Sequence, residues 1–137
     1  MNFNHFLGLY REERIDRVIV YNVEPIIAHA LGARVLRVYL SAETLRKQRL
    51  RHPDLTVDHY RSLRPTLAFG EYRQESPRTA MVLFLDTKLN DWGFRAHVKS
   101  TRNGRELYVD SFCLMRRKTY NRALAKPYPI IKAHRLI

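Results

Sequence analysis

The stretch Phe94–Leu114, FRAHVKSTRNGRELYVDSFCL, decides the fold. Two runs in which apolar and polar residues alternate, Phe94–Arg102 and Arg105–Leu114, flank the dipeptide Asn103-Gly104. Asn-Gly is the preferred two-residue type I′ turn between antiparallel strands, because both of its positions need a positive φ. The stretch therefore predicts a β-hairpin.

This turn also predicts the register of the two strands. The residue pairs opposite each other are Lys99 with Tyr108, His97 with Asp110, and Phe94 with Cys113. The apolar face, which we expect to join the core, carries Phe94, Ala96, Val98, Leu107, Val109 and Cys113. The opposite face, which is polar, basic and aromatic, carries Arg95, His97, Lys99, Thr101, Tyr108, Asp110 and Phe112. Ser111 falls on the core side, as a buried polar group or one that reaches a cleft. Antiparallel sheets often leave one face in water, and a wet face of this composition is suited to binding or catalysis.

The chain before the hairpin changes from helical to β patterns. Ser41 and Pro53 bound a predicted helix over 42–51, because serine caps helices and the residue before a proline leaves the α region. The other predicted helices are Val23–Leu31, Val57–Leu63 (ended by Pro65) and Arg117–Ala125. The predicted strands are Val35–Leu40, the central strand Met81–Leu85 and the edge strand Tyr128–Ile131, whereas Ile15–Tyr21 reads as a short strand or an apolar helix end.

Helices that precede an antiparallel sheet are typical of the α+β class. We expect N-terminal helices packed on a C-terminal antiparallel sheet. The 137 residues suit a single domain over 1–137, with residues 1–14 as a candidate N-terminal extension.

The charge is strongly positive. Lysine and arginine number 25 against 13 acidic residues, which gives a net charge of +12. No acidic residue lies between Ser111 and Ile137, a stretch that holds Arg116, Arg117, Lys118, Arg122, Lys126, Lys132 and Arg135. A second basic cluster is Arg46, Lys47, Arg49 and Arg51. Such clusters favour a polyanionic partner, and nucleic acid above all, although a solubilising surface is the alternative.

Several classes of function have no support. A single cysteine, Cys113, rules out an intrachain disulfide and a cysteine-based zinc site. No apolar run approaches the roughly 20 residues of a membrane span, and no signal peptide or basic amphipathic helix is recognisable. Phosphate-loop, dinucleotide-binding and α/β-hydrolase motifs are absent from the sequence, and the carboxylates are scattered. We expect no cofactor and no metal, so an enzyme of this sequence would work without one.

Metal-free cleavage of RNA suits this composition. A base takes the proton of the ribose 2′-OH, an acid protonates the leaving 5′-oxygen, and cations stabilise the charge on phosphorus. His52 is the first candidate, because it ends a basic helix in Arg51-His52-Pro53. His97 faces Asp110 as either a structural or a catalytic pair, and Lys99 on the wet face would contact phosphate. Tyr120 and Arg116 lie at the start of the last helix, where N–H groups favour phosphate.

Two blocks resemble a known family. Residues 38–72, VYLSAETLRKQRLRHPDLTVDHYRSLRPTLAFGEY, and residues 94–112, followed by Thr119-Tyr120, resemble the phage branch of the barnase–EndoU–colicin–RelE-like nuclease superfamily. The resemblance implies metal-independent RNA cleavage, in many cases by toxins or by proteins that accompany phage heads. Carried over by position, it implies a site built from His52, Lys47, Lys99, Ser111 and Tyr120.

The leading hypothesis is therefore a small endoribonuclease that uses 2′-OH attack. His52 would act as base or acid, Lys99 and Lys47 would stabilise charge, and Tyr120 with Ser111 would position the substrate.

The expected nucleic-acid contacts are Arg49, Arg51, Arg95, His97, Tyr108, Arg116, Arg117 and Lys118. The expected partners are RNA and an acidic immunity or antitoxin protein, with no membrane. The expected location is the cytoplasm, a target cell or a virion. The alternatives are a phage or mobile-element protein that binds nucleic acid without catalysis, or one that inhibits an acidic protein.

Overall fold

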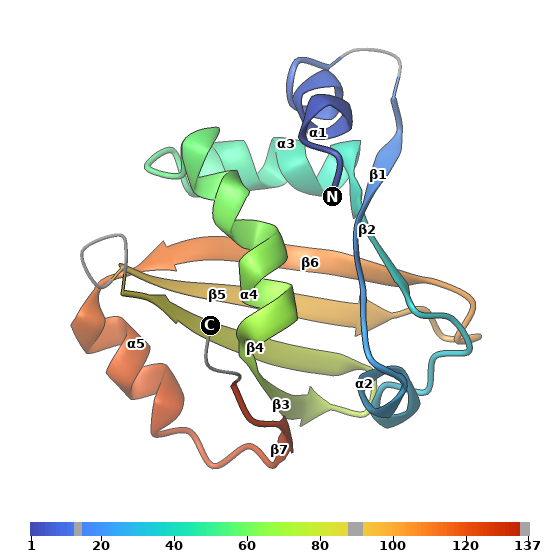
Figure 1. Ribbon diagram of the computed structural model, residues 1–137, viewed down its shortest axis with the longest axis vertical. Coiled ribbons are helices and arrows are strands. Elements are labelled where there is room, and N and C mark those ends of the chain that lie inside the picture. The colour runs from blue at the N-terminus through green and yellow to red at the C-terminus, as the bar shows by residue number, and fades with distance from the viewer. Residues whose placement is uncertain (13–14, 88–91, 135–137) are drawn as a thin grey trace.

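The structure, a computed structural model, describes residues 1–12, 15–87 and 92–134 (Figure 1). The elements in chain order are α1 (Phe3–Tyr10), β1 (Arg17–Asn22), α2 (Pro25–Ala30), β2 (Arg37–Ser41), α3 (Ala42–Arg51), the 3₁₀ helix η1 (Asp58–Ser62), α4 (Leu63–Phe69), β3 (Glu71–Ser76), β4 (Thr79–Asp86), β5 (Trp92–Ser100), β6 (Leu107–Met115), α5 (Arg117–Leu124) and β7 (Ile130–Lys132). The predicted α+β class is confirmed. Arg135, in the basic C-terminal stretch, lies outside the described residues. No helix in the described part is both long enough and apolar enough to cross a membrane.

One sheet of seven strands organises the chain, in the order β1-β2-β6-β5-β4-β3-β7. Every neighbouring pair is antiparallel except β2 and β6, which run parallel. The sheet is therefore mixed, and it includes strands from the N-terminal half that the predicted arrangement left outside it. A parallel pair needs a long connection, and here the chain passes through α3, α4 and the β3–β5 meander before it returns as β6.

Local sequence signals account for most of the helix ends. The Ser41 hydroxyl accepts a hydrogen bond from Thr44 N at 3.1 Å, and α3 occupies the predicted residues. The prediction that Pro65 stops a helix is wrong. Pro65 lies in the first turn of α4, where its missing N–H has no intrahelical partner to lose, and the helix continues to Phe69. The strand β3 was not predicted, because Tyr72 is its only buried residue and an apolar alternation is absent.

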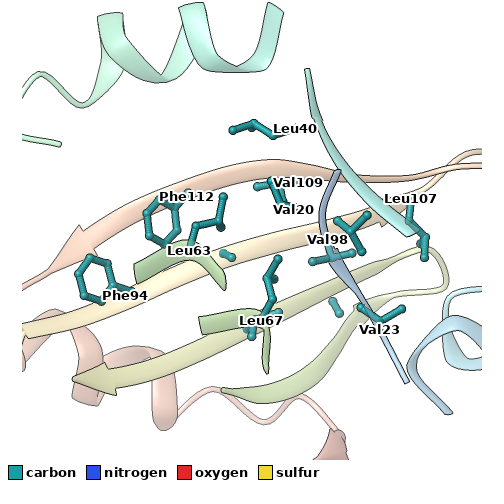
Figure 2. Packing of buried hydrophobic residues seen from close by; sticks show 14 of the residues in the cluster. Val20, Val23, Leu40, Leu63, Leu67, Phe94, Val98, Leu107, Val109 and Phe112 are labelled. Carbon is teal, nitrogen blue, oxygen red and sulfur yellow. The ribbon is translucent and has the colours of Figure 1, made fainter. Parts of the chain in front are cut away.

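The main core lies between one face of the sheet and a layer of helices. Figure 2 shows Phe94 and Phe112 on neighbouring strands, with Leu63 and Leu67 of α4 packed over this face. The Phe94 and Phe112 rings stack with centroids 5.4 Å apart. The helix α1 belongs to the same core, since Phe6 is fully buried and its ring centroid lies 4.9 Å from that of Tyr60.

The hairpin keeps its predicted register only near the turn. Lys99 pairs with Tyr108 and Val98 with Val109, as expected. The register then shifts by one residue, so His97 pairs with Ser111 and Asp110 has no partner on β5. The predicted pairs of His97 with Asp110 and of Phe94 with Cys113 are therefore wrong. Such a β-bulge moves every later side chain of the bulged strand to the other face.

This shift exchanges the faces of three residues. Phe112, expected on the wet face, is fully buried in the main core. Cys113, expected in the core, is buried on the opposite face under α5. Ser111, expected on the core side, lies beside His97 on the other face. The alternation rule failed here because it assumes an unbroken period of two.

The turn itself has four residues, 102–105, and is not the expected two-residue type I′ turn. Gly104 has a φ of 72°, but Asn103 does not have a positive φ. The Asn103 side chain accepts a hydrogen bond from Arg105 N at 3.0 Å, and Gly104 N donates to Thr101 O at 2.9 Å. Gly104 O also accepts from Arg34 N at 2.7 Å, so the turn is held against the segment after α2.

Gly104 and Gly32 provide a matched test of this contact. Both have a positive φ, but a Cβ on Gly104 would lie 2.3 Å from Gly32 O, whereas a Cβ on Gly32 would meet nothing within 4 Å. We expect Gly32→Ala to lower the free energy of unfolding by about 1 kcal/mol, the cost of the left-handed conformation. Gly104→Ala adds a steric clash with backbone, and we expect a loss of at least about 2 kcal/mol. Urea unfolding of both variants measures this, and equal losses would contradict the close approach.

Candidate active site on the open sheet face

Helix α5 covers one end of the second face of the sheet. Beneath α5 lies a small apolar cluster, formed by Met81, Leu83, Cys113, Met115, Tyr120 and Ala123. Tyr120 is 8% exposed, and its ring packs so closely on Gly93 that a Cβ there would lie 2.7 Å from Tyr120 Cδ2. Burial also raises the pKa of Tyr120. Tyr120 thus packs between α5, to which it belongs, and the sheet, a position that does not fit the predicted contact with substrate.

Beyond α5, three polar side chains from three strands meet at His97. His97 Nδ1 lies 2.6 Å from Ser111 Oγ on β6, and His97 Nε2 lies 3.1 Å from Glu75 Oε2 on β3. The side chains of His97 and Glu75 are 18% and 32% exposed. Both ring nitrogens therefore have partners, while the group still reaches solvent.

The surroundings favour a neutral imidazole. Burial lowers the pKa of His97, and the positive charge of Arg95 acts in the same direction, against the opposing effect of Glu75. In the neutral form, Nε2–H donates to the Glu75 carboxylate, and Nδ1 accepts from the Ser111 hydroxyl, which is the one tautomer that satisfies both contacts. A neutral histidine has the geometry of a general base when one ring nitrogen accepts a hydrogen bond from a hydroxyl and a carboxylate orients the ring through the other nitrogen.

Arg95 adds positive charge beside this group. It lies two residues before His97 on β5 and opposite Cys113 on β6. Its buried Nε has no hydrogen-bond partner within the described part of the chain. The Arg95 side chain also interacts with the thiol of Cys113, where its positive charge acts against the burial that raises the pKa of this cysteine.

A hollow of about 480 Å³ lies beyond Lys99, on the side of the β5–β6 turn. His97, Ser111 and Glu75 do not line it, and Lys99 and Asp110 are the lining residues nearest to them along β5 and β6. Its lining includes three basic residues, two hydroxyl residues at the start of α3 and the bulge residue: Arg78, Lys99, Arg102, Ser41, Thr44 and Asp110. Lys99 follows His97 by two residues on one strand, so the two side chains share this face about 7 Å apart along the strand. Lys47 lies at the border of the hollow, because its Nζ is 3.3 Å from Oε1 of Glu43, which also lines it.

The structure does not place His52 in this hollow. His52 caps the C-terminus of α3, and its backbone N donates to Gln48 O at 2.8 Å. No hydrogen bond, ion pair or ring contact joins its imidazole to another residue that the structure describes. The turn that follows His52 contains Asp54, whose negative charge adds to the effect of burial in raising the pKa of Cys113. Because Cys113 lies under α5, this turn lies toward the α5 end of the sheet. Sequence reasoning thus paired His52 with Lys99, whereas the structure joins His97 to Ser111.

The other predicted nucleic-acid contacts are spread over the molecule. Arg49 is engaged elsewhere, because Nη1 donates to Tyr10 O at 2.9 Å and the guanidinium lies 4.3 Å from the centre of the Tyr10 ring. Tyr108 lines the hollow, and its hydroxyl donates to Glu106 at 2.5 Å and accepts from Arg17 at 3.0 Å. The exposed remainder, on α3 and at the start of α5, is Arg51, Arg116, Arg117 and Lys118.

Two residues of the site escaped the sequence analysis, Glu75 and Arg78. Both belong to the β3–β4 hairpin, whose first strand was not predicted. The only local signal is the proline at 77, which follows Glu75 by two residues and indicates a turn. A turn alone does not show which strand lies next to His97. No group of three or more histidine, cysteine, aspartate or glutamate side chains that suits a metal ion occurs among the described residues.

Comparison with known proteins adds no assignment. No protein-family model, no curated protein and no solved structure matches the chain.

The neutral state of His97 is testable by titration. We expect NMR to give the His97 ring a pKa below 6.5, and Glu75→Gln to lower that pKa further, because Glu75 favours the charged ring. The unfolded chain then binds more protons than the folded one between the lowered value and 6.5. The free energy of unfolding should therefore fall as the pH is lowered through this window, and the window should be wider in the variant. The control is Asp58→Asn, which removes an exposed carboxylate in η1. An equal change of the His97 pKa in both variants would contradict the contact of Glu75 with His97.

Proposed function

We propose that the protein is a metal-independent endoribonuclease whose active site lies on the open sheet face around His97. The observation that carries the proposal is the contact of His97 with Ser111 and Glu75, on a face that also holds Arg95 and Lys99. A polyanionic substrate matches the net charge of +12. The family resemblance supports the same reaction class, although it had implied His52 as the central residue.

The proposed chemistry uses His97 as a proton carrier. Nδ1 accepts the proton of the ribose 2′-OH, which takes the place of the Ser111 hydroxyl at this nitrogen. The 2′-oxygen bonds to phosphorus, the bond from phosphorus to the 5′-oxygen breaks, and the leaving oxygen receives the proton. The products are a 2′,3′-cyclic phosphate and a free 5′-hydroxyl. Glu75 stabilises the transient imidazolium, and the cations Lys99 and Arg95 stabilise the phosphorane charge.

RNA is preferred over DNA in this scheme, because DNA lacks the 2′-OH that attacks. Such an activity fits the cytoplasm of the producing cell, a target cell or a virion-associated protein. A cell that makes the protein would need to cover the basic face, and an acidic immunity or antitoxin protein is the matching partner.

One observation favours a second function, nucleic-acid binding without catalysis. Ser111 and Glu75 occupy both ring nitrogens of His97, and the three residues also tie β3, β5 and β6 together. In that case His97 is a structural link, and the basic face serves only to hold the nucleic acid.

The cleavage reaction separates the two functions. With a single-stranded RNA in excess chelator, we expect the wild-type protein to form 2′,3′-cyclic phosphate ends. His97→Gln should lower the rate by at least about 10²-fold, the contribution typical of general acid–base catalysis, and should leave RNA affinity nearly unchanged. The matched control is His59→Gln, since the His59 ring accepts from Thr56 N within the helical layer, at 2.9 Å.

The outcomes differ for each function. No cleavage by the wild-type protein, with salt-sensitive RNA binding retained, would leave the non-catalytic binder. Neither cleavage nor RNA binding would favour a protein that inhibits an acidic target. His52→Gln belongs in the same series, because a loss equal to that of His97→Gln would contradict a scheme in which His97 alone carries the proton.

The pH dependence of cleavage gives an independent check. Because the base must be neutral, kcat/KM should rise with pH through the pKa of His97 and level off above it. Since that pKa is lowered, the rise should lie below pH 6.5. In Glu75→Gln the rise should move to still lower pH. A rise that does not follow the His97 titration measured by NMR would show that another group is the base.

A further inference from the structure

A second cavity, of about 500 Å³, lies at the far end of the open face, where β1 and β2 meet the β5–β6 turn. Figure 1 shows this turn beside the N-terminal end of β2. The lining combines two kinds of surface. Val35, Leu36 and Tyr39 are apolar or aromatic, and the arginines Arg17, Arg37 and Arg105 are cationic. Leu36 is 41% exposed, an unusual position for a large apolar side chain in so basic a surface.

One arginine of this cavity is held in place. The Arg17 guanidinium lies 4.0 Å from the centre of the Tyr39 ring, and Nη1 donates both to the Glu106 carboxylate and, at 3.0 Å, to Tyr108 Oη. Hydrogen bonds from the Tyr108 hydroxyl and from Arg17 lower the pKa of Glu106, so the carboxylate keeps its charge opposite Arg17. A guanidinium stacked on tyrosine is a planar surface on which a nucleobase stacks at little cost in side-chain entropy.

The other two arginines have no such partners. The guanidinium groups of Arg37 and Arg105 form no hydrogen bond, ion pair or ring contact with another residue in the described ranges. Two unpaired cations beside an apolar, aromatic floor match one class of ligand, a planar ring that carries a phosphate. An acidic peptide would use the arginines but not the stacking surface.

This cavity lies next to the hollow that holds Lys99, with Tyr39 and Tyr108 between the two. Tyr108 lines the hollow that holds Lys99, and its ring centroid lies 6.0 Å from that of Tyr39, which lines the second cavity. His97, Lys99, Tyr108 and Tyr39 therefore follow one another across β5, β6 and β2 on the same face. This row of side chains leads from His97 to the second cavity.

We propose that the cavity at Arg17, Tyr39, Arg37 and Arg105 is a nucleotide subsite for the same RNA strand, beyond the nucleotide that reacts at His97. The inference rests on the proposed function for the identity of the strand as substrate, but not for its binding. The substrate class that follows is single-stranded RNA of several nucleotides, because a base that stacks on Arg17 or Tyr39 must be free of a duplex.

The test measures binding separately from cleavage. Fluorescence anisotropy follows a labelled single-stranded oligonucleotide with 2′-O-methyl riboses, which cannot react, in a long form of nine nucleotides and a short form of two. We expect Arg37→Ala/Arg105→Ala to lower the affinity for the long form by about tenfold and to reduce its salt slope by about 1.4, or 0.7 for each lost phosphate contact. The affinity for the short form should not change, since it reaches only the site at His97.

The control removes the same charge elsewhere. Arg11→Ala/Arg64→Ala also deletes two arginines, both exposed and both in the helical layer on the other side of the sheet. If this variant loses as much affinity as Arg37→Ala/Arg105→Ala, total charge and not a subsite governs binding, and the proposal is overturned. Equal affinity of the wild-type protein for a duplex and for the single strand would overturn it as well.

Two further outcomes identify the source of the nucleotide and separate this proposal from the enzymatic one. If an unlabelled mononucleotide displaces the labelled long oligonucleotide as effectively as the unlabelled long oligonucleotide does, the site serves a free nucleotide and the RNA-strand proposal fails. If the unmodified RNA is not cleaved but the loss of affinity occurs as expected, the enzymatic proposal fails and the subsite stands. If cleavage occurs and the loss of affinity does not, the reverse holds.

Discussion

A single unpaired residue, Asp110, sets the arrangement of side chains along β6. Val98 pairs with Val109 and His97 with Ser111, so Asp110 has no partner on β5. Beyond this bulge, each side chain of β6 points to the face opposite to the one that simple alternation predicts. Without the bulge, Phe112 would face water and Ser111 would face the core. With it, Phe112 stacks on Phe94 in the core, and Ser111 meets His97 on the open face. Core packing and the candidate site thus depend on the same backbone irregularity.

The two faces of the sheet have different tasks because they are covered differently. The helical layer packs over the first face. Gln48 of α3 covers the part of β6 that lies beyond its pairing with β2, because Gln48 Nε2 donates to Phe112 O at 2.6 Å. On the second face, α5 covers the end near Gly93. The remaining part presents His97, Lys99 and Tyr108, held on paired strands whose backbone cannot shift independently. A site on such a rigid floor keeps its geometry better than one on loops.

The positive charge is organised by what each cation contacts. Arg17 is held by Glu106 and Tyr108, and Arg49 by Tyr10. The contacts of Arg49 join α3 to α1, whereas those of Arg17 hold its guanidinium in place at the rim of the second cavity. Lys99, Arg37 and Arg105 line hollows on the open face instead, where a phosphate can approach them. The net charge of +12 predicts a polyanionic partner, but only this division separates cations that stabilise the fold from those available to bind a partner.

Local patterns in the sequence determined the class and most elements: Ser41 started α3 where expected, Gly32 ended α2, and the alternation around Asn103-Gly104 predicted the β5–β6 hairpin. These signals are readable because caps, turns and alternation act within a few residues. The place of β1 and β2 in the sheet, the bulge at Asp110 and the position of Glu75 were decided by tertiary packing. The polar strand β3 carries no apolar period, and nothing local brings Glu75 to His97 across β4. Such contacts depend on which strands become neighbours, and that is set by burial of the whole core.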